Sequence, residues 1–408
     1  MAWLGGHIQT ANDYTSEFAP AMNALLAGRL HAFMTLQPID GAGGSILLRA
    51  PGALAGKLLV GGQHAIFRFG SLLCELAAGA LGLALARDMR ERGLPILSRV
   101  TVVGLCVLAA AILDEIYFGH PEETLGATLC IGAVLCSGAG RPTLAGLMLG
   151  CAIINKPWGV LALAPVVLAS QCGLRRLGLG AVAALLPCAA LVYGLDPARA
   201  LHAIVAASAL ARVAHPEDVW WPLAHAVHLP GTTPYYAPPR FLVAHARELA
   251  VLAALALSFP LARARLSIDR PSRVPARSGA RARGLLGGDR GGEDRTRTDS
   301  ALALLALLLL VRCMLDPSNH VYYQVPFVMS LLAWDSRVSR APARALLAAG
   351  LLWLVFHTIS GVAGLPLQCA AYMLVTLPFA ILLLAPATAG ALRWPTLPPW
   401  RLAPGATA

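Results

Sequence analysis

The sequence predicts an all-α protein, a polytopic integral membrane helical bundle of about 9 to 11 transmembrane helices. Of its 408 residues 57% are hydrophobic and only 13% are charged, too few to cover a water-soluble globule of this size. Long apolar stretches recur along the chain, and none shows the alternating polarity that is typical of membrane β-barrels. The clearest are residues 70–86, 100–112, 177–195, 241–262, 301–311 and 365–385.

The basic residues lie between these stretches and set the predicted topology. The positive-inside rule places 22 of the 32 Lys and Arg residues on one side, which we expect to face the cytoplasm. The opposite, extracytoplasmic side then holds residues 1–69, 119–123, Lys156, 196–240 and 316–323. No basic face interleaved with aromatic residues is present, so nucleic acid is not an expected partner.

The chain divides into four predicted segments. They are an extracytoplasmic loop at 1–69, a first transmembrane bundle at 70–262, a flexible Arg-rich cytoplasmic loop at 263–299 and a C-terminal transmembrane bundle at 300–408. Within the first loop, 19–30 and 46–60 are amphipathic and predict juxtamembrane helices. Because the helix at 70–86 runs inwards, residues 1–69 begin outside. Either a further helix upstream brings them there, which we favour, or the N-terminus is translocated unaided.

The first constellation that can carry chemistry is Asp13-Tyr14-Thr15-Ser16-Glu17. Its two carboxylates, four residues apart, share one face of a helix, and either Asp13 or Glu17 is a candidate base. The alternative is a helix start, with Asp13 as the cap and Glu17 as a first-turn acid.

The second constellation is the turn at 118–123, where His120, Glu122 and Glu123 follow two further acids. So many titratable groups at one outer turn indicate a metal or polar-substrate site. An ordinary helix start, with Pro121 in the first turn followed by acids, explains the same pattern.

The third constellation, Asn155-Lys156-Pro157-Trp158, interrupts an apolar region with one of only two lysines in the chain. A lone lysine on the side that positive charge avoids favours an anionic partner such as a phosphate at the interface. A lysine that snorkels from a helix end is the alternative.

The fourth constellation spans residues 312–323 and contains Arg312, Asp316, Asn319 and Tyr323. An arginine near a membrane helix end is costly to insert, which makes Arg312 a functional candidate. A structural Arg312–Asp316 pair across one helical turn is the simpler explanation.

Taken together, these motifs resemble those of the GT-C superfamily of membrane glycosyltransferases, and are most similar to its bacterial branch that uses polyprenyl-phosphate mannose. The resemblance covers most of the chain except the Arg-rich loop. It implies a polyprenyl-phosphate-linked sugar as donor, a glycan or glycolipid as acceptor, and membrane lipid around both. It further implies that Asp13, or Glu17 as second choice, is the general base, and that Lys156 and Arg312 neutralise the lipid phosphate.

The resemblance also implies residues that line the sugar and acceptor site, namely His120, Glu122, Glu123, Asp316, Asn319 and Tyr323. No cofactor follows from the sequence, although the outer acids leave a divalent cation open as an alternative. The main rival function is a membrane transporter or lipid flippase without glycosyl transfer, for which Glu75 inside an apolar stretch fits better. A non-catalytic membrane scaffold is the third alternative.

Overall fold

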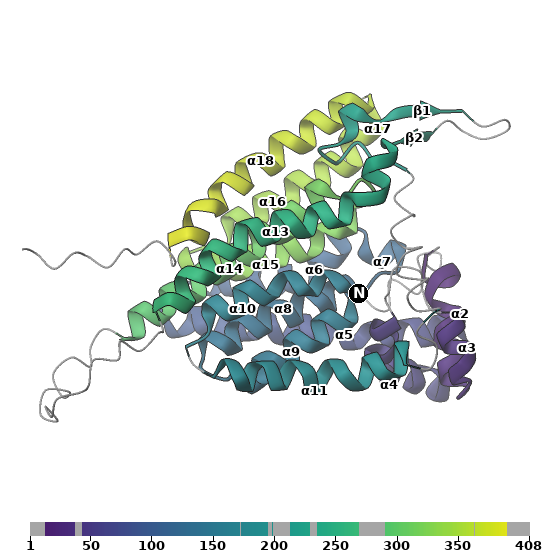
Figure 1. Ribbon diagram of the computed structural model, residues 1–408, viewed down its shortest axis with the longest axis horizontal. Helices are drawn as coiled ribbons and strands as arrows, with labels where there is room; N and C mark the ends of the chain where they lie inside the picture. Colours follow the sequence, from purple (N-terminus) through teal and green to yellow (C-terminus); the bar gives the residue numbers. More distant parts are fainter. Residues whose placement is uncertain are drawn as a thin grey trace, which may run out of the picture.

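A computed structural model describes residues 13–36, 43–171, 173–194, 198, 213–228, 235–268, 290–362 and 364–389. The helical elements are η1 (Tyr14–Phe18), α2 (Ala19–Leu26), α3 (Leu30–Thr35), α4 (Gly43–Leu59), α5 (Gly62–Glu91), α6 (Ile96–Ile112), α7 (Glu115–Phe118), α8 (Glu122–Gly138), α9 (Pro142–Asn155), η2 (Pro157–Ala162), α10 (Leu163–Ala169), α11 (Leu174–Tyr193), η3 (Trp221–Leu223), α13 (Arg240–Ile268), α14 (Arg290–Leu315), η4 (Val321–Gln324), α15 (Val325–Val338), α16 (Ala343–Trp353), η5 (Leu354–Ile359), α17 (Ser360–Val362) and α18 (Leu365–Ala389). The long helices lie side by side (Figure 1). The all-α prediction is confirmed except for one antiparallel ribbon, in which β1 (His225–Val227) pairs with β2 (Tyr235–Ala237).

Five helical segments in the described part of the chain are long and apolar enough to cross a membrane. They are Gly62–Glu91, Ile96–Phe118, Leu174–Leu191, Arg295–Leu315 and Leu365–Thr388. Four more apolar helices are shorter: Pro142–Asn155, Pro157–Ala169, Glu248–Phe259 and Ala343–Ile359. The expected total of about 9 to 11 transmembrane helices therefore stays a prediction beyond these five.

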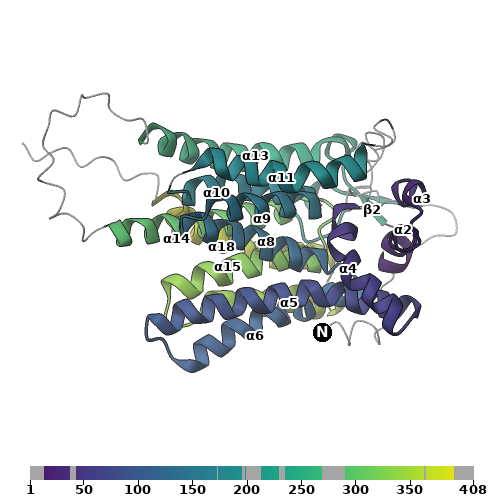
Figure 2. The same ribbon diagram turned by 90° about the horizontal axis from the view of Figure 1, so that it is seen from below.

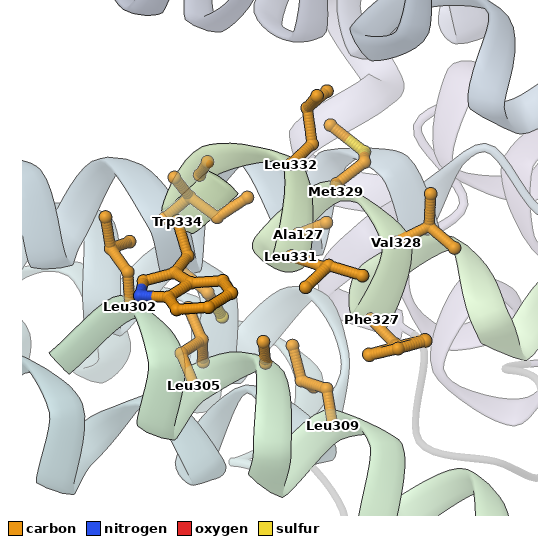
Figure 3. Packing of buried hydrophobic residues seen from close by; sticks show 14 of the residues in the cluster. Ala127, Leu302, Leu305, Leu309, Phe327, Val328, Met329, Leu331, Leu332 and Trp334 are labelled. Carbon is orange, nitrogen blue, oxygen red and sulfur yellow. The ribbon is translucent and has the colours of Figure 1, made fainter. Parts of the chain in front are cut away.

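The core of the bundle forms around α14 and α15. Every residue from 301 to 310 and from 325 to 336 is buried, so each helix is covered on all sides by its neighbours. Leu305 and Leu309 of α14 lie close to Phe327 and Leu331 of α15, and Ala127 of α8 lies behind them (Figure 3). A continuous run of leucines thus marks a central helix.

Glycines allow two other helix pairs to approach closely. A Cβ atom added to Gly146 of α9 would lie 2.0 Å from the backbone oxygen of Leu177 in α11, and one added to Gly150 would lie 2.5 Å from that of Ala181. These glycines are four residues apart, the spacing typical of close helix contacts in membranes. Helix α4 contacts its neighbours in the same way, since a Cβ on Gly44 would meet the backbone of Ile154. Close packing therefore fixes α9 and α4, the two helices that lead to the site described below.

The two ends of the bundle differ in their polar contacts. At one end, Arg337 pairs with Asp299 (Nε–Oδ1, 2.6 Å) and with Asp88 (Nη1–Oδ1, 3.6 Å), which joins the ends of α5, α14 and α15. At the other end lie α2, α3, α7 and the β ribbon (Figures 1 and 2). Turns predicted to face the cytoplasm gather at the first end, and the candidate site residues gather at the second.

Two predicted boundaries are corrected. The loop expected over 263–299 is shorter, because α13 continues to Ile268 and α14 already begins at Arg290. Charged residues in that segment are helical, and Arg295 pairs with Asp88 of α5 across the bundle end. Helix α5 begins at Gly62 rather than at residue 70, after a turn at Gly61 with φ 79°. Residues 269–289 of the predicted loop lie outside the described residues.

Candidate functional site

The turn between α7 and α8 forms the centre of the site. Asp114 has a left-handed backbone conformation with φ 56° and allows the chain to leave α6 for the short helix α7. The Glu115 carboxylate then accepts hydrogen bonds from the Thr124 hydroxyl (2.7 Å) and the Thr124 backbone N–H (3.3 Å). It thereby satisfies polar groups in the first turn of α8. The turn that carries His120 and Glu122 is fixed as a result.

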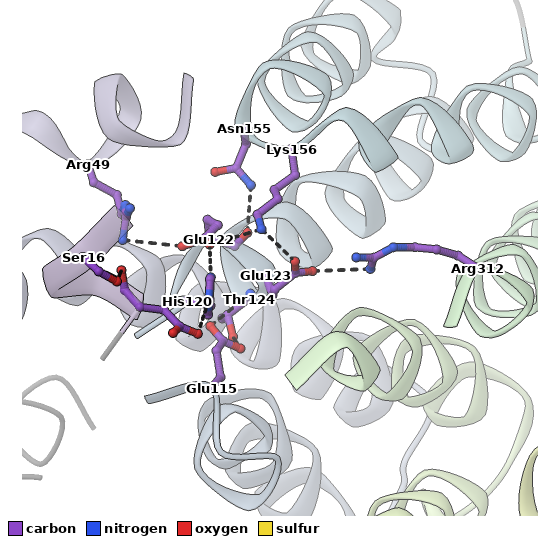
Figure 4. A network of polar contacts seen from close by, with 11 residues as sticks. Ser16, Arg49, Glu115, His120, Glu122, Glu123, Thr124, Asn155, Lys156 and Arg312 are labelled. Atoms are coloured by element: carbon purple, nitrogen blue, oxygen red, sulfur yellow. Dashed lines mark hydrogen bonds and ion pairs between the residues drawn. The ribbon is translucent and has the colours of Figure 1, made fainter. Parts of the chain in front are cut away.

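His120 links this turn to the N-terminal segment. Its Nε2 lies 3.1 Å from Asp13 Oδ2, and its Nδ1 lies 2.7 Å from Glu122 Oε1 (Figure 4). The ring stacks on Tyr322 with centroids 4.3 Å apart, and Phe18 meets it edge-on. His120 is buried, whereas the Asp13 side chain is 34% exposed. Asp13 therefore lies at the open edge of a network whose interior is closed.

The two buried glutamates share a lysine. Lys156 Nζ lies 3.3 Å from Glu122 Oε1 and 3.3 Å from Glu123 Oε1. Lys156 has an extended backbone between α9 and η2, because Pro157 begins the next helical turn, and its side chain is thereby directed back at α8. The preceding Asn155 donates a hydrogen bond to the Glu122 backbone oxygen at 2.8 Å. The break in the apolar region thus positions the lysine.

Two arginines complete the network from opposite sides. Arg49 of α4 pairs with Glu122 (Nη1–Oε2, 3.6 Å), and Arg312 of α14 pairs with Glu123 (Nη1–Oε2, 3.5 Å). The Arg312 guanidinium also lies over the rings of Trp158 and Tyr323, at 5.1 and 4.8 Å from their centroids. Aromatic faces and a carboxylate together hold this cation in a buried position.

The network as a whole carries one positive charge in excess. It contains three carboxylates, Asp13, Glu122 and Glu123, and four cations when His120 is protonated, the others being Arg49, Lys156 and Arg312. Buried charges are stable only when they are paired and hydrogen-bonded, and an unbalanced positive charge favours an anion nearby. The arrangement suits a ligand that brings a negative group close to the cations of the network.

Six of the ten predicted site residues meet in this network, namely Asp13, His120, Glu122, Glu123, Lys156 and Arg312. Tyr323 joins through its contact with Arg312. Glu17 is exposed on η1, and Asp316 accepts a hydrogen bond from the backbone N–H of Ser318 at 3.0 Å.

Asn319 belongs to a second polar cluster, which is buried between segment 213–228 and α18. Its side chain donates to the Glu217 backbone oxygen (2.5 Å) and to the Tyr372 hydroxyl (3.1 Å). The neighbouring Asp218 is fully buried, and burial raises its pKa to about 8. Asn319 therefore holds segment 213–228 against the bundle, and the sugar contact expected from the sequence stays a prediction.

Three members of the site were not predicted. Arg49 was assigned to an interfacial helix, and the structure instead buries it, with no hydrogen-bond partner for its Nε and Nη2 among the described residues. Glu115 and Tyr322 were also absent from the predicted site residues, although their polar neighbours in sequence were included. The one signal for Arg49 was a single arginine within a helix that is otherwise rich in glycine and alanine.

No group of three or more His, Cys, Asp and Glu side chains among the described residues is arranged to hold a metal ion. Each carboxylate of the network instead faces a cationic side chain. Comparisons of the chain with protein-family models, with curated proteins and with solved structures give no match.

Proposed function

We propose that the chain is a multi-pass cell-membrane glycosyltransferase of the GT-C type. In this proposal it moves a sugar, mannose in the branch it resembles, from a polyprenyl-phosphate donor to a hydroxyl group of a glycan or glycolipid acceptor. The reaction takes place on the extracytoplasmic face. Asp13 is the general base, and a divalent cation is not assigned.

One observation carries the proposal: four short motifs far apart in the sequence converge on a single charged network at one end of an apolar helical bundle. Asp13, His120, Lys156 and Arg312 come from four separate segments, yet each contacts a carboxylate or cation of the others. A transporter that moves charge through the bilayer instead places such groups near the midplane. Their position at helix ends supports chemistry on a substrate held at the interface.

The arrangement suits the proposed reaction step by step. The Asp13 carboxylate takes the proton of an acceptor hydroxyl, whose oxygen bonds to C1 of the sugar as the bond from C1 to the phosphate oxygen breaks. The electron pair leaves with the lipid phosphate. Because the network has one positive charge in excess, Arg312 and Lys156 stabilise the developing negative charge on that group. The prenyl chain stays beside the apolar helices throughout.

Proteoliposomes distinguish this function from its main rival. Vesicles that contain the protein receive a radiolabelled polyprenyl-phosphate mannose together with an acceptor glycolipid. The proposal predicts a radiolabelled acceptor and a released polyprenyl phosphate. Movement of intact donor across the bilayer with no labelled acceptor would show a flippase instead, and in that case Glu75, whose Oε2 is buried without a hydrogen-bond partner in the described structure, becomes the residue to substitute.

A further inference from the structure

The hydrogen bonds of His120 define its charge. Both ring nitrogens face carboxylate oxygens, at 3.1 Å from Asp13 and 2.7 Å from Glu122. An ionised carboxylate can only accept hydrogen bonds, and a neutral imidazole has only one N–H to donate. Two such contacts at once therefore require the doubly protonated ring.

The surroundings hold the ring in this orientation. Tyr322 stacks on one face at an interplanar angle of 13°, and Phe18 packs edge-on at 84°. The backbone N–H of His120 donates a hydrogen bond to the backbone oxygen of Glu115 at 3.1 Å, which anchors the main chain on α7. A ring flip would replace both nitrogens by carbons, so the ring has one orientation that satisfies both acids.

We propose that His120 is a positioning residue, an imidazolium that fixes the Asp13 carboxylate at the edge of the network, and not a residue that binds sugar. For its effect on catalysis this inference rests on the proposed function. Asp13 lies at the start of the short N-terminal helical segment, and its carboxylate contacts the bundle through His120. With Oδ2 held in this way, Oδ1 is the oxygen presented to an acceptor hydroxyl.

The charged groups around the ring keep it protonated. Burial alone lowers the pKa of His120, but the charge of Glu122 and the hydrogen bonds to Asp13 and Glu122 outweigh it and raise the pKa to about 9, although Lys156 opposes them. From the opposite side, His320 contributes no competing charge, because burial and its histidine neighbours lower its pKa to about 3. The clamp, by which we mean the contact of the His120 imidazolium with the Asp13 carboxylate, is therefore intact at neutral pH. It is lost as the pH rises through about 9 and the pKa of His120 is passed.

Nuclear magnetic resonance tests the charge without reference to activity. Protein labelled with ¹⁵N-histidine is titrated in detergent micelles, and the His120 signal is assigned by its loss in His120→Gln. We expect both nitrogens to carry protons at neutral pH and to titrate near 9. Asp13→Asn removes one acceptor charge but leaves the ring in place, and it lowers that titration point. A singly protonated His120 at neutral pH would overturn the proposal.

The pH dependence of sugar transfer tests the consequence. Wild-type activity falls as the pH rises through about 9, whereas His120→Gln is slower by about 10- to 100-fold and shows no such fall. His225→Gln, at an exposed histidine on β1, keeps the wild-type profile. An unchanged alkaline fall in His120→Gln refutes the positioning role. A protonated His120 in a chain that transfers no lipid-linked sugar refutes the glycosyltransferase instead and leaves the clamp standing.

Discussion

The variant Lys156→Met tests whether the charged side chains around Glu122 and Glu123 form an ionic network that stabilises the fold. Methionine keeps the length of the side chain but removes the ammonium group that lies 3.3 Å from both Glu122 and Glu123. Removing one partner of a buried ion pair costs about 3–5 kcal/mol, since the remaining charge loses its counterion. Glu122 keeps His120 and Arg49, but Glu123 keeps only Arg312 as a cationic partner among the described residues, at 3.5 Å. We therefore expect a loss near the lower limit, about 3 kcal/mol.

The free energy of unfolding is measured in detergent by denaturant titration with tryptophan fluorescence. Lys57→Met is the matched control, because Lys57 is the only other lysine and its exposed ammonium group donates one hydrogen bond, to the Leu26 backbone oxygen. That control costs less than about 1 kcal/mol. In a double-mutant cycle, Lys156→Met combined with Glu123→Gln loses about 0.5–3 kcal/mol less than the sum of the two single losses, because both single changes remove the same contact. Equal losses for the two lysines, together with additive losses in the cycle, would refute the network.

Three further predictions concern packing, pH and backbone conformation. Gly146→Ala places a methyl group against the Leu177 backbone oxygen and costs about 1–3 kcal/mol of unfolding free energy, whereas Gly178→Ala, with open space around it, is neutral. The raised pKa of Asp218 means that the folded state keeps a proton that the unfolded chain releases, so docking of segment 213–228 weakens as the pH rises from 3.8 to about 8. Asp218→Asn removes that dependence, as limited proteolysis of the segment at several pH values checks; equal pH dependence in both proteins contradicts it. Asp114→Ala loses about 1–2 kcal/mol more than Asp114→Asn in the same unfolding assay, because asparagine tolerates φ 56° better than alanine, and equal losses would rule this out.

The sequence predicts the helical class well because hydrophobic composition and the length of apolar stretches report directly on it. It also identifies most of the charged network, since Lys156 and Arg312 stand out in apolar surroundings where an ionisable group is costly. A local signal of this kind needs no knowledge of the partner. The free-energy cost that makes ionisable residues rare in apolar segments also makes them easy to identify in the sequence.

Other members of the site carry no local signal. Arg49 lies in a helix with an amphipathic sequence, and its burial depends on the close packing of α4, in which Gly44 meets the backbone of Ile154. Asn319 lies in a motif that resembles a substrate site, yet its partners Glu217 and Tyr372 come from distant segments. Pairing between segments this far apart is a property of the packed bundle and is not encoded in the spacing within either segment.

The charges at the bundle end that holds Asp88 and Arg337 illustrate the same limit. A segment rich in Arg, Gly and Asp predicts a loop, but α14 is already helical at Arg295 and Asp299, which pair with residues of α5 and α15. Composition describes the isolated segment and not its contacts with neighbouring helices. Helix boundaries are therefore where the sequence and the structure differ most.

The most direct test of the account compares two carboxylates in one transfer assay. Asp13→Asn and Glu17→Gln are measured beside the wild type for transfer of sugar from radiolabelled polyprenyl-phosphate mannose to an acceptor. Asp13 contacts His120, whereas Glu17 is exposed on the same short helix and serves as the matched control. The account predicts that transfer disappears in Asp13→Asn and persists in Glu17→Gln. Full transfer in Asp13→Asn, or its loss only in Glu17→Gln, would contradict the assignment of Asp13 as the base.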